Sequence, residues 1–176
     1  VVTQLGFGGG FRTMISEEQA DRIFNVVLDA GINFIDTSPD YGFSEDRIGA
    51  SISHRRHEFY LATKCGCNVI GPEGKAHAID HLWTADRLHR NIEESLKRLK
   101  TDYVDLLQMH SPSVEQVEQG RLVETLLEIR DSGKARFIGV SSKLPDLALF
   151  MRMQGFDTFQ FPYSALGRRH ERIIQD

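Results

Sequence analysis

The chain has few cysteines, no long apolar run and no excess of basic residues, and each shortage excludes a class of protein. Its two cysteines, Cys65 and Cys67, are too few and too close for a disulfide framework, so a reducing cytoplasm is the expected compartment. No apolar stretch approaches the roughly 18–20 residues of a membrane helix, and Val1-Val2-Thr3-Gln4 does not resemble the start of a signal peptide. Its 21 basic and 25 acidic residues give a formal net charge of −4, which offers no basic surplus for nucleic acid. We therefore expect neither a membrane nor a nucleic acid as partner.

What the sequence does contain is an alternation of short apolar strands and amphipathic helices, typical of a mostly parallel α/β sheet. The predicted strands are Val2–Phe7, Ile32–Asp36, Phe59–Lys64, Val104–His110, Arg136–Ser141 and Thr158–Tyr163. The predicted helices are about Glu17–Ala30, Glu45–Ser53, Ala85–Lys100, Arg121–Ser132, Pro145–Gln154 and Arg168–Ile174. Eight β/α units make a (β/α)₈ barrel of about 250 residues, so 176 residues hold about six. The pattern fits either a smaller α/β sheet or a barrel whose end is missing.

Two helix starts carry capping signals. Ser16 with Gln19 predicts a capping box before the first helix, and Thr84 predicts an N-cap for the helix that begins at Ala85. Gly31 and Gly133 are expected to end the helices that precede them. The longest irregular connection, Gly66–Trp83, follows a strand end, where α/β proteins place ligand-binding loops.

Polar side chains stand at the carboxyl ends of successive predicted strands. Asp36, Lys64 and His110 each end a strand, and Ser141-Ser142 ends the next one. Tyr41 follows Asp36 by five residues in the loop beyond the strand. Because the carboxyl ends of parallel strands meet at one edge, we expect these side chains to face one another around one mouth.

This set of side chains has a chemical logic. A free tyrosine has a pKa of about 10, and a neighbouring Lys64 would lower that pKa while Asp36 keeps the lysine charged. Tyr41 could then donate a proton to a developing alkoxide, and His110 could hydrogen-bond the same oxygen. This suits proton transfer coupled to hydride transfer. Taken singly, each residue also has a structural explanation: a salt bridge at a strand end, a satisfied histidine, or a tyrosine packed in a turn.

Three segments carry a resemblance to a known family. They are Asp36-Thr37-Ser38-Pro39-Asp40-Tyr41-Gly42 with the trailing Ser44-Glu45 and Ile48-Gly49, then Leu88-x₃-Ile92-x₃-Leu96 running through Asp105-Leu106 to His110, and then Gly133–Ser141. In this order they resemble the Asp-Thr-Ala-x-x-Tyr-Gly segment, the signature helix with the fourth strand, and the fifth strand of the aldo-keto reductases. The resemblance spans essentially the whole chain.

The resemblance implies a (β/α)₈ barrel that reduces aldehydes or ketones with NADPH, or with NADH in some members. It implies Tyr41 as proton donor, Lys64 and Asp36 as the residues that tune it, and His110 as the residue that orients the carbonyl. Ser141, Ser142 and Gln160 would hold the nicotinamide carboxamide. Ser142 departs from the asparagine usual in the family, and its hydroxyl reaches less far. The expected partner is a small carbonyl compound; the sequence leaves the oligomeric state open.

Other features of the family do not occur in the sequence. The hairpin before the first strand and the last two β/α units, which grip the pyrophosphate and the adenosine 2′-phosphate, have no counterpart in residues 1–176. NADP versus NAD preference is therefore not readable. Because six strands would leave open sheet edges, we expect this barrel domain to belong to a polypeptide of roughly 270–330 residues.

Several alternatives accompany this interpretation. Cys65 and Cys67, with His77, His81 and His89 in the neighbourhood, invite a metal site, but two thiols one residue apart do not have the usual zinc spacing, so no metal is expected. Trp83 is either a packing residue or an apolar wall of the substrate pocket, and Phe7, Phe11 and Phe43 raise the same question.

Two other functions compete with a reductase. A non-catalytic, cofactor-binding regulatory subunit is the alternative on the same fold. A metal-dependent hydrolase would want paired histidines at the end of the first strand, where the sequence has Gly6-Phe7-Gly8-Gly9-Gly10 instead. That glycine run suits a backbone held close to a ligand, although its spacing is not that of a dinucleotide fingerprint.

Overall fold

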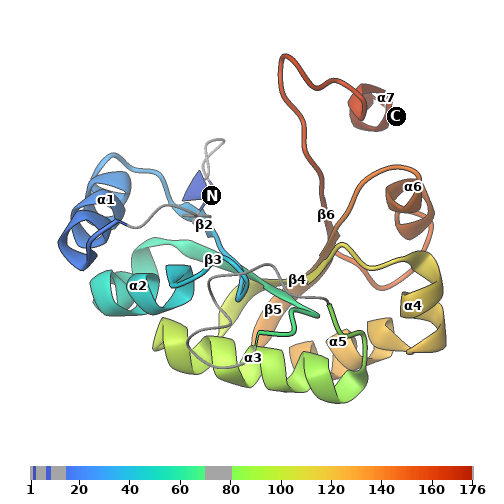
Figure 1. The fold of residues 1–176 in the computed structure, drawn as a ribbon, viewed down its shortest axis with the longest axis horizontal. Coiled ribbons are helices and arrows are strands. Elements are labelled where there is room, and N and C mark those ends of the chain that lie inside the picture. Colours follow the sequence, from blue (N-terminus) through green and yellow to red (C-terminus); the bar gives the residue numbers. More distant parts are fainter. Residues whose placement is uncertain (1, 3–6, 9–14, 70–80, 176) are drawn as a thin grey trace.

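The computed structural model describes residues 2, 7–8, 15–69 and 81–175, and its centre is one curled parallel sheet (Figure 1). The strands are β1 (Phe7–Gly8), β2 (Phe34–Asp36), β3 (Tyr60–Cys65), β4 (Val104–His110), β5 (Ala135–Ser141) and β6 (Thr158–Gln160). The six strands lie in the same order in the sheet as in the chain, and every neighbouring pair is parallel. Right-handed crossovers with this order place successive helices on one face, as in a barrel. The fold is thus a partial (β/α)₈ barrel and not a doubly wound sheet.

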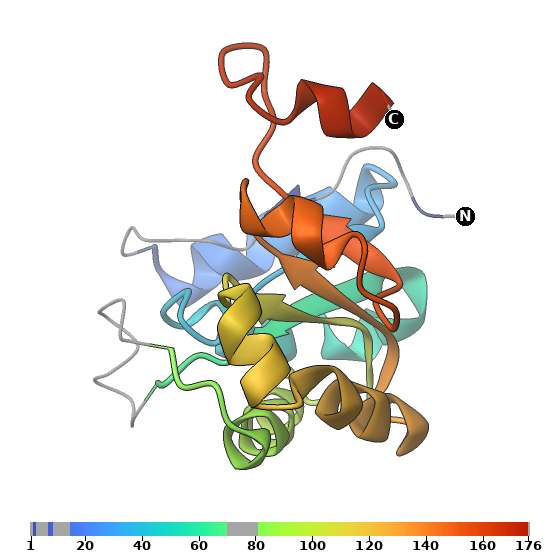
Figure 2. The same ribbon diagram turned by 90° about the vertical axis from the view of Figure 1, so that its right-hand side faces the viewer.

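All the described helices except the last cover the outer, convex face of the sheet, as Figures 1 and 2 show from two sides. The helices are α1 (Glu17–Asp29), α2 (Ser44–Ser51), α3 (Ala85–Leu99), α4 (Val114–Gln119), α5 (Leu122–Asp131), α6 (Asp146–Phe150) and α7 (Glu171–Gln175), with a 3₁₀ segment η1 at Ser53–Glu58. The core between helices and sheet includes Phe24, Ile35, Ile48, Leu61, Leu88, Ile92, Leu107, Met109, Leu126, Ile138, Val140 and Phe150. The α7 helix stands apart from the rest at the end of an extended segment. No helix in these ranges has the length and apolar character needed to cross a membrane.

The predicted capping signals form as expected. Ser16 and Gln19 make a reciprocal capping box at α1, and the Thr84 side chain accepts a hydrogen bond from the Arg87 amide at the start of α3. Gly31 and Gly133 adopt positive φ angles of 83° after α1 and α5. The α3 helix is not followed by a glycine: its C-cap is Lys100, which takes a left-handed conformation with φ 53°.

Several predicted boundaries were wrong. Strand β6 ends at Gln160 and not at Tyr163, because Pro162 has no N–H to donate to a neighbouring strand. Helix α4 was not predicted, although Ser113 and Gln116 form a capping box in front of it that signals a helix start. The helices expected at 145–154 and 168–174 are shorter, at 146–150 and 171–175. Most of the predicted first strand lies outside the described residues.

Helix α2 is fastened to its neighbours by a buried carboxylate. Glu45, whose side chain is 1% exposed, accepts a hydrogen bond of 2.6 Å from the Thr63 hydroxyl and one of 2.7 Å from Nε of Arg98. Gly49, one turn further along α2, lets this helix approach the end of α3: a Cβ at Gly49 would lie 2.0 Å from the Arg98 carbonyl oxygen. Two residues of the family-like segment therefore serve packing.

We expect Glu45→Ala to lower the free energy of unfolding by about 3 kcal/mol, because it leaves a largely buried guanidinium and a buried hydroxyl without their acceptor. Urea denaturation of the full-length protein measures this change. Glu18→Ala, at an exposed position in the first turn of α1, is the matched control and should cost only a few tenths of a kcal/mol. The double variant Glu45→Ala/Arg98→Met should recover part of the loss, since it removes the unpaired charge as well. A loss below about 1 kcal/mol for the single variant would contradict this assignment.

Candidate active site

The site is built by side chains of alternate strand residues, which share the concave face of the sheet. On β2, β3, β4 and β5 the core residues Ile35, Cys65, Met109 and Val140 face the helices. Their chain neighbours Asp36, Lys64, His110 and Ser141 therefore point to the opposite face, since successive side chains alternate. The register then sets them side by side: Lys64 lies beside Gln108, His110 beside Ser141, and Ser141 beside Gln160. The structure thus brings the predicted residues to one edge of the sheet.

Lys64 is the buried centre of this group. It is 1% exposed, and its Nζ donates to both carboxylate oxygens of Asp36, at 2.9 and 2.7 Å, and to the Thr37 carbonyl oxygen at 2.9 Å. The Gln108 side-chain amide also donates to Asp36, at 3.3 Å. The sequence analysis missed Gln108, although it stands two residues before His110 and so on the same face of β4. These contacts fix the position of the ammonium group.

Tyr41 lies in the turn between β2 and α2. Its amide donates to the Ser38 carbonyl oxygen at 3.1 Å, and its own carbonyl oxygen accepts from the Ser44 amide at 3.2 Å. Nζ of Lys64 lies 4.9 Å from the centroid of the Tyr41 ring, and the His110 ring makes an edge contact with Tyr41 at 5.9 Å between centroids. Asp36, Tyr41, Lys64 and His110 therefore form one contiguous cluster.

Lys64 lowers the pKa of Tyr41 as expected, but the net pKa of Tyr41 is nevertheless raised. Burial raises the pKa of the Tyr41 phenol above its ordinary value of 10, and the nearby charges of Asp36 and Asp40 raise it further. The positive charge of Lys64 acts in the other direction and lowers the pKa, as the sequence analysis expected, but it does not outweigh burial. Tyr41 is consequently protonated at neutral pH and holds its proton more firmly than a free tyrosine does.

A second set of contacts surrounds the His110 ring. Its Nδ1 lies 3.2 Å from Oδ2 of Asp40, 3.3 Å from the Ser38 hydroxyl and 3.5 Å from Sγ of Cys67. Burial raises the pKa of Asp40, but the hydrogen bond and charge of His110 together with the Ser38 hydroxyl outweigh it and lower the pKa to about 2. Asp40 is therefore a carboxylate that can hold the His110 ring in its orientation. Sequence reasoning missed Ser38 and Asp40 as site residues, although both stand in the loop that carries Tyr41.

The two cysteines have different surroundings. Sγ of Cys65 is fully buried and lies 3.5 Å from the Gln108 carbonyl oxygen, whereas Cys67 lies beside His110. Burial, helped by the Asp40 charge, raises the pKa of the Cys67 thiol to about 12. The Cys67 carbonyl oxygen accepts bonds from the Arg87 guanidinium at 2.8 and 3.0 Å and from the Asn91 amide at 3.0 Å. The start of α3 thus holds the backbone of Cys67 in place.

Trp83 packs against this segment. Its ring stacks on His81 with 5.6 Å between centroids, and it covers Gly66, where a Cβ would lie 2.2 Å from the indole. Gly66 also has a φ of +89°, which favours glycine. These contacts support the packing interpretation of Trp83. Phe43 lines a surface cleft elsewhere, between α1, α2 and α3, and Phe11 and His77 lie outside the described residues.

The predicted carboxamide-binding residues lie next to the cluster around Lys64. Ser141 ends β5 beside His110 and pairs with Gln160 on β6, and the Ser142 amide donates to the Gln160 carbonyl oxygen at 2.9 Å. A primary carboxamide has an oxygen that accepts and an NH₂ group that donates. The two hydroxyls and the Gln160 side-chain amide offer both kinds of partner. The donor set therefore fits the nicotinamide end of the cofactor.

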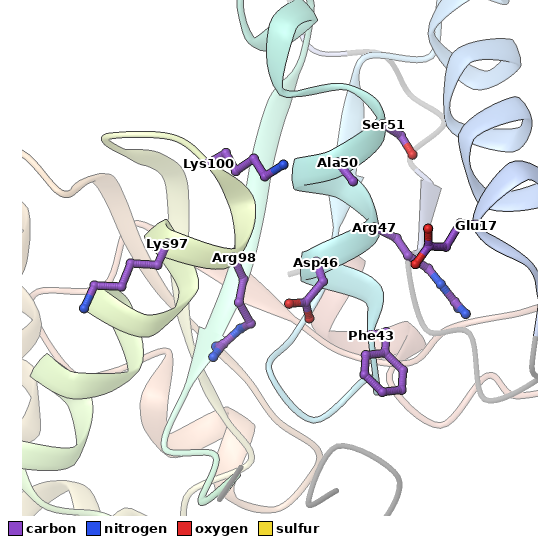
Figure 3. A pocket seen from close by; sticks show the side chains of 9 residues that line it. All are labelled: Glu17, Phe43, Asp46, Arg47, Ala50, Ser51, Lys97, Arg98 and Lys100. Atoms are coloured by element: carbon purple, nitrogen blue, oxygen red, sulfur yellow. The ribbon is translucent and has the colours of Figure 1, made fainter. Parts of the chain in front are cut away.

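A surface cleft of about 610 Å³ lies elsewhere, between the start of α1, the α2 helix and the C-terminal end of α3 (Figure 3). Its lining includes Phe43, Arg47, Lys97, Arg98 and Lys100 but none of the cluster around Lys64. Arg47 and Arg98 are already engaged, with the Ile15 carbonyl oxygen and with Glu45. This cleft is therefore separate from the candidate active site.

A parallel sheet whose strands follow chain order, with helices on its outer face, defines the class of (β/α)₈-barrel proteins. The comparison with known families agrees: the sequence model of the Aldo/keto reductase family matches residues 4–175. The chain belongs to the aldo/keto reductase family, whose members are oxidoreductases. This confirms the resemblance drawn from the sequence motifs.

Individual relatives support the assignment. The chain is 34% identical to the aldo-keto reductase YhdN of Bacillus subtilis, over 95% of this chain and 50% of that protein, and 31% identical to L-galactose dehydrogenase of Arabidopsis thaliana, over 85% and 48%. The holo form of an aldo-keto reductase from Bacillus halodurans matches with a TM-score of 0.85 and 31% identity, over 99% of this chain and 59% of that one. An aldo/keto reductase from Klebsiella pneumoniae in complex with NADP and acetate matches with a TM-score of 0.78 and 26% identity. The match covers 97% of this chain and 58% of that one. The chain spans about half the length of the curated relatives it matches.

Proposed function

We propose that this protein reduces aldehyde or ketone groups to alcohols, or catalyses the reverse reaction, with NADPH or NADH as hydride donor. The observation that carries the proposal is the placement of Tyr41 between the buried Lys64 ammonium and the His110 ring. Reduction of a carbonyl group requires a proton at its oxygen, and a phenol in this position can donate it. We propose residues 1–176 as one barrel domain of this enzyme.

Each residue of the cluster has a part in the proposed reaction. Ser141, Ser142 and Gln160 would hold a nicotinamide, which would supply the hydride for the carbonyl carbon. Tyr41 donates its phenolic proton to the carbonyl oxygen as negative charge develops there, and His110 orients that oxygen by a hydrogen bond. Lys64, held by Asp36, stabilises the phenolate that Tyr41 leaves behind. In the reverse direction the same phenolate accepts the proton of the alcohol.

Ser141, Ser142 and Gln160 are the residues we assign to the nicotinamide carboxamide. Ser141 ends β5 beside His110, Ser142 comes directly after it, and Gln160 ends the neighbouring strand β6. Holding the carboxamide there would set the nicotinamide ring against the side of the cluster where the carbonyl binds. The solved complex of the Klebsiella relative with NADP supports a nicotinamide cofactor for this chain.

The test is cofactor consumption by the full-length protein. We expect NADPH or NADH to be oxidised in the presence of at least one compound from a panel of aldehydes, ketones and aldoses. Aldoses belong in the panel because one relative is named L-galactose dehydrogenase. The reverse assay pairs NADP or NAD with sugars and alcohols. Cofactor binding without turnover of any compound in either direction would favour the regulatory-subunit alternative and contradict the proposal.

A further inference from the structure

Four side chains with metal-binding atoms converge at the mouth of the sheet. Asp40, Cys67, His81 and His110 each offer one ligand atom, and these atoms all lie within 4.8 Å of one another. They come from three separate parts of the chain: the loop after β2, the two sides of the connection after β3, and the end of β4. We propose that these four residues form a zinc-binding site.

The distances are close to those of a tetrahedral zinc site. With metal–ligand bonds of 2.0–2.3 Å, the ligand atoms of such a site stand about 3.3–3.8 Å apart. In the structure Nδ1 of His110 lies 3.2 Å from Oδ2 of Asp40 and 3.5 Å from Sγ of Cys67. Nε2 of His81 lies 3.7 Å from the same Asp40 oxygen. Shifts of about 1 Å in the remaining pairs would complete the tetrahedron.

The chemistry of the set favours zinc over other common cations. One thiolate, two imidazoles and one carboxylate suit a borderline-soft ion, whereas magnesium and calcium prefer oxygen ligands alone. Asp40 and the Cys67 thiolate would balance both charges of Zn²⁺. The nearby charge of Lys64 is already paired with Asp36. A coordinating metal deprotonates a thiol outright, so burial of the neutral Cys67 thiol is no obstacle.

The surroundings hold the four ligands in place without a metal. The Ser38 hydroxyl bonds to Asp40 and lies 3.3 Å from His110 and 3.5 Å from Cys67. Cys67 and His81 pair as an isolated antiparallel bridge, and Trp83 stacks on the His81 ring. Such outer contacts fix the ligand orientation before binding and increase metal affinity.

The sequence analysis expected no metal because it weighed the two thiols as a pair. In the structure only one of them takes part. Cys65 belongs to the core, and the other ligands come from elsewhere in the chain: Asp40 from the loop after β2 and His110 from the end of β4. His110 also belongs to the proposed carbonyl-reducing cluster, so zinc occupancy and carbonyl reduction are coupled through this side chain.

Cobalt(II) is the probe for the test, because its spectrum reports both the geometry and the ligands. Full-length protein without a histidine tag is stripped with a chelator and titrated with Co²⁺, then with Zn²⁺. We expect one Co²⁺ per chain, with the visible bands of a tetrahedral ion and the near-ultraviolet absorption of a cobalt–thiolate bond. An equimolar amount of Zn²⁺ should displace the Co²⁺ and abolish both the visible bands and the thiolate absorption. Absence of binding, or binding without the thiolate absorption, would overturn the proposal.

Matched variants tie the signal to these residues. Cys67→Ala and His81→Ala should each weaken zinc binding by about 100-fold or more, since loss of an outer-shell partner alone costs 10–100-fold. Cys65→Ala and His89→Ala remove the neighbouring thiol and an exposed α3 histidine, and should leave zinc affinity unchanged. Unchanged affinity in Cys67→Ala would refute the site. These titrations measure binding and not turnover, so their failure would leave the reductase proposal standing, and the reverse also holds.

Discussion

Tyr41→Phe should lower kcat for carbonyl reduction by about 10²–10⁴-fold, the usual contribution of general acid catalysis. The phenol supplies its proton only in the transition state, so its loss falls on kcat and not on ground-state binding. Cofactor affinity, measured by quenching of protein fluorescence, should remain within about two-fold of the wild-type value. The ring itself remains in the variant, and its contacts with Lys64 and His110 are kept.

Tyr163→Phe is the matched control for this variant. Tyr163 is 47% exposed, and its hydroxyl lies 3.5 Å from a carboxylate oxygen of Glu171, far along the chain from Tyr41. Its kcat should equal that of the wild type. If Tyr41→Phe kept more than about a tenth of the wild-type kcat, the phenol would not be the proton donor, because that loss is too small for general acid catalysis.

The parts of the site that could be predicted from the sequence are those that follow from strand periodicity. Asp36 and His110 end apolar strands, Lys64 is one residue from the end of β3, and parallel pairing in chain order brings such ends together. The same reasoning placed Ser141 at this edge, whereas Gln160, which pairs with it, came from the family resemblance. These predictions needed only a side-chain period of two and a parallel register, and both can be read from local patterns.

The parts that could not be predicted depend on loop contacts between distant residues. His110 meets Ser38 across 72 positions of the chain, and Cys67 meets Ser38 across 29. Loops have no regular side-chain periodicity, so contacts between distant loop residues cannot be predicted from the sequence pattern. The pKa of Tyr41 shows the same limit: the neighbouring Lys64 was predictable, but the degree of burial that raises the pKa was not. The sequence motifs predicted which groups would react, whereas the charges and burial that set their pKa values could be read only from the packed structure.

The Lys64→Met variant should lose as much kcat as Tyr41→Phe, because it removes the charge that stabilises the phenolate. Reduction requires protonated Tyr41, so the rate falls as pH rises through the Tyr41 pKa, which already lies above 10. Loss of Lys64 removes an interaction that lowers this pKa, so the pKa rises further and the alkaline limb moves to higher pH. Phenolate absorbance, with Tyr41→Phe as the blank, measures the shift independently of turnover. An unchanged pKa would show that Lys64 does not tune Tyr41.

A second variant separates this electrostatic role from folding. Lys64 is 1% exposed and holds Asp36 with two bonds, so Lys64→Met leaves a carboxylate without its cation and should cost about 3–5 kcal/mol of stability. Lys64→Met/Asp36→Asn removes that unpaired charge and should recover much of the stability while kcat stays low. If the double variant regained activity together with stability, Lys64 would be a structural residue only. Recovery of stability alone would assign to its ammonium group the stabilisation of the Tyr41 phenolate.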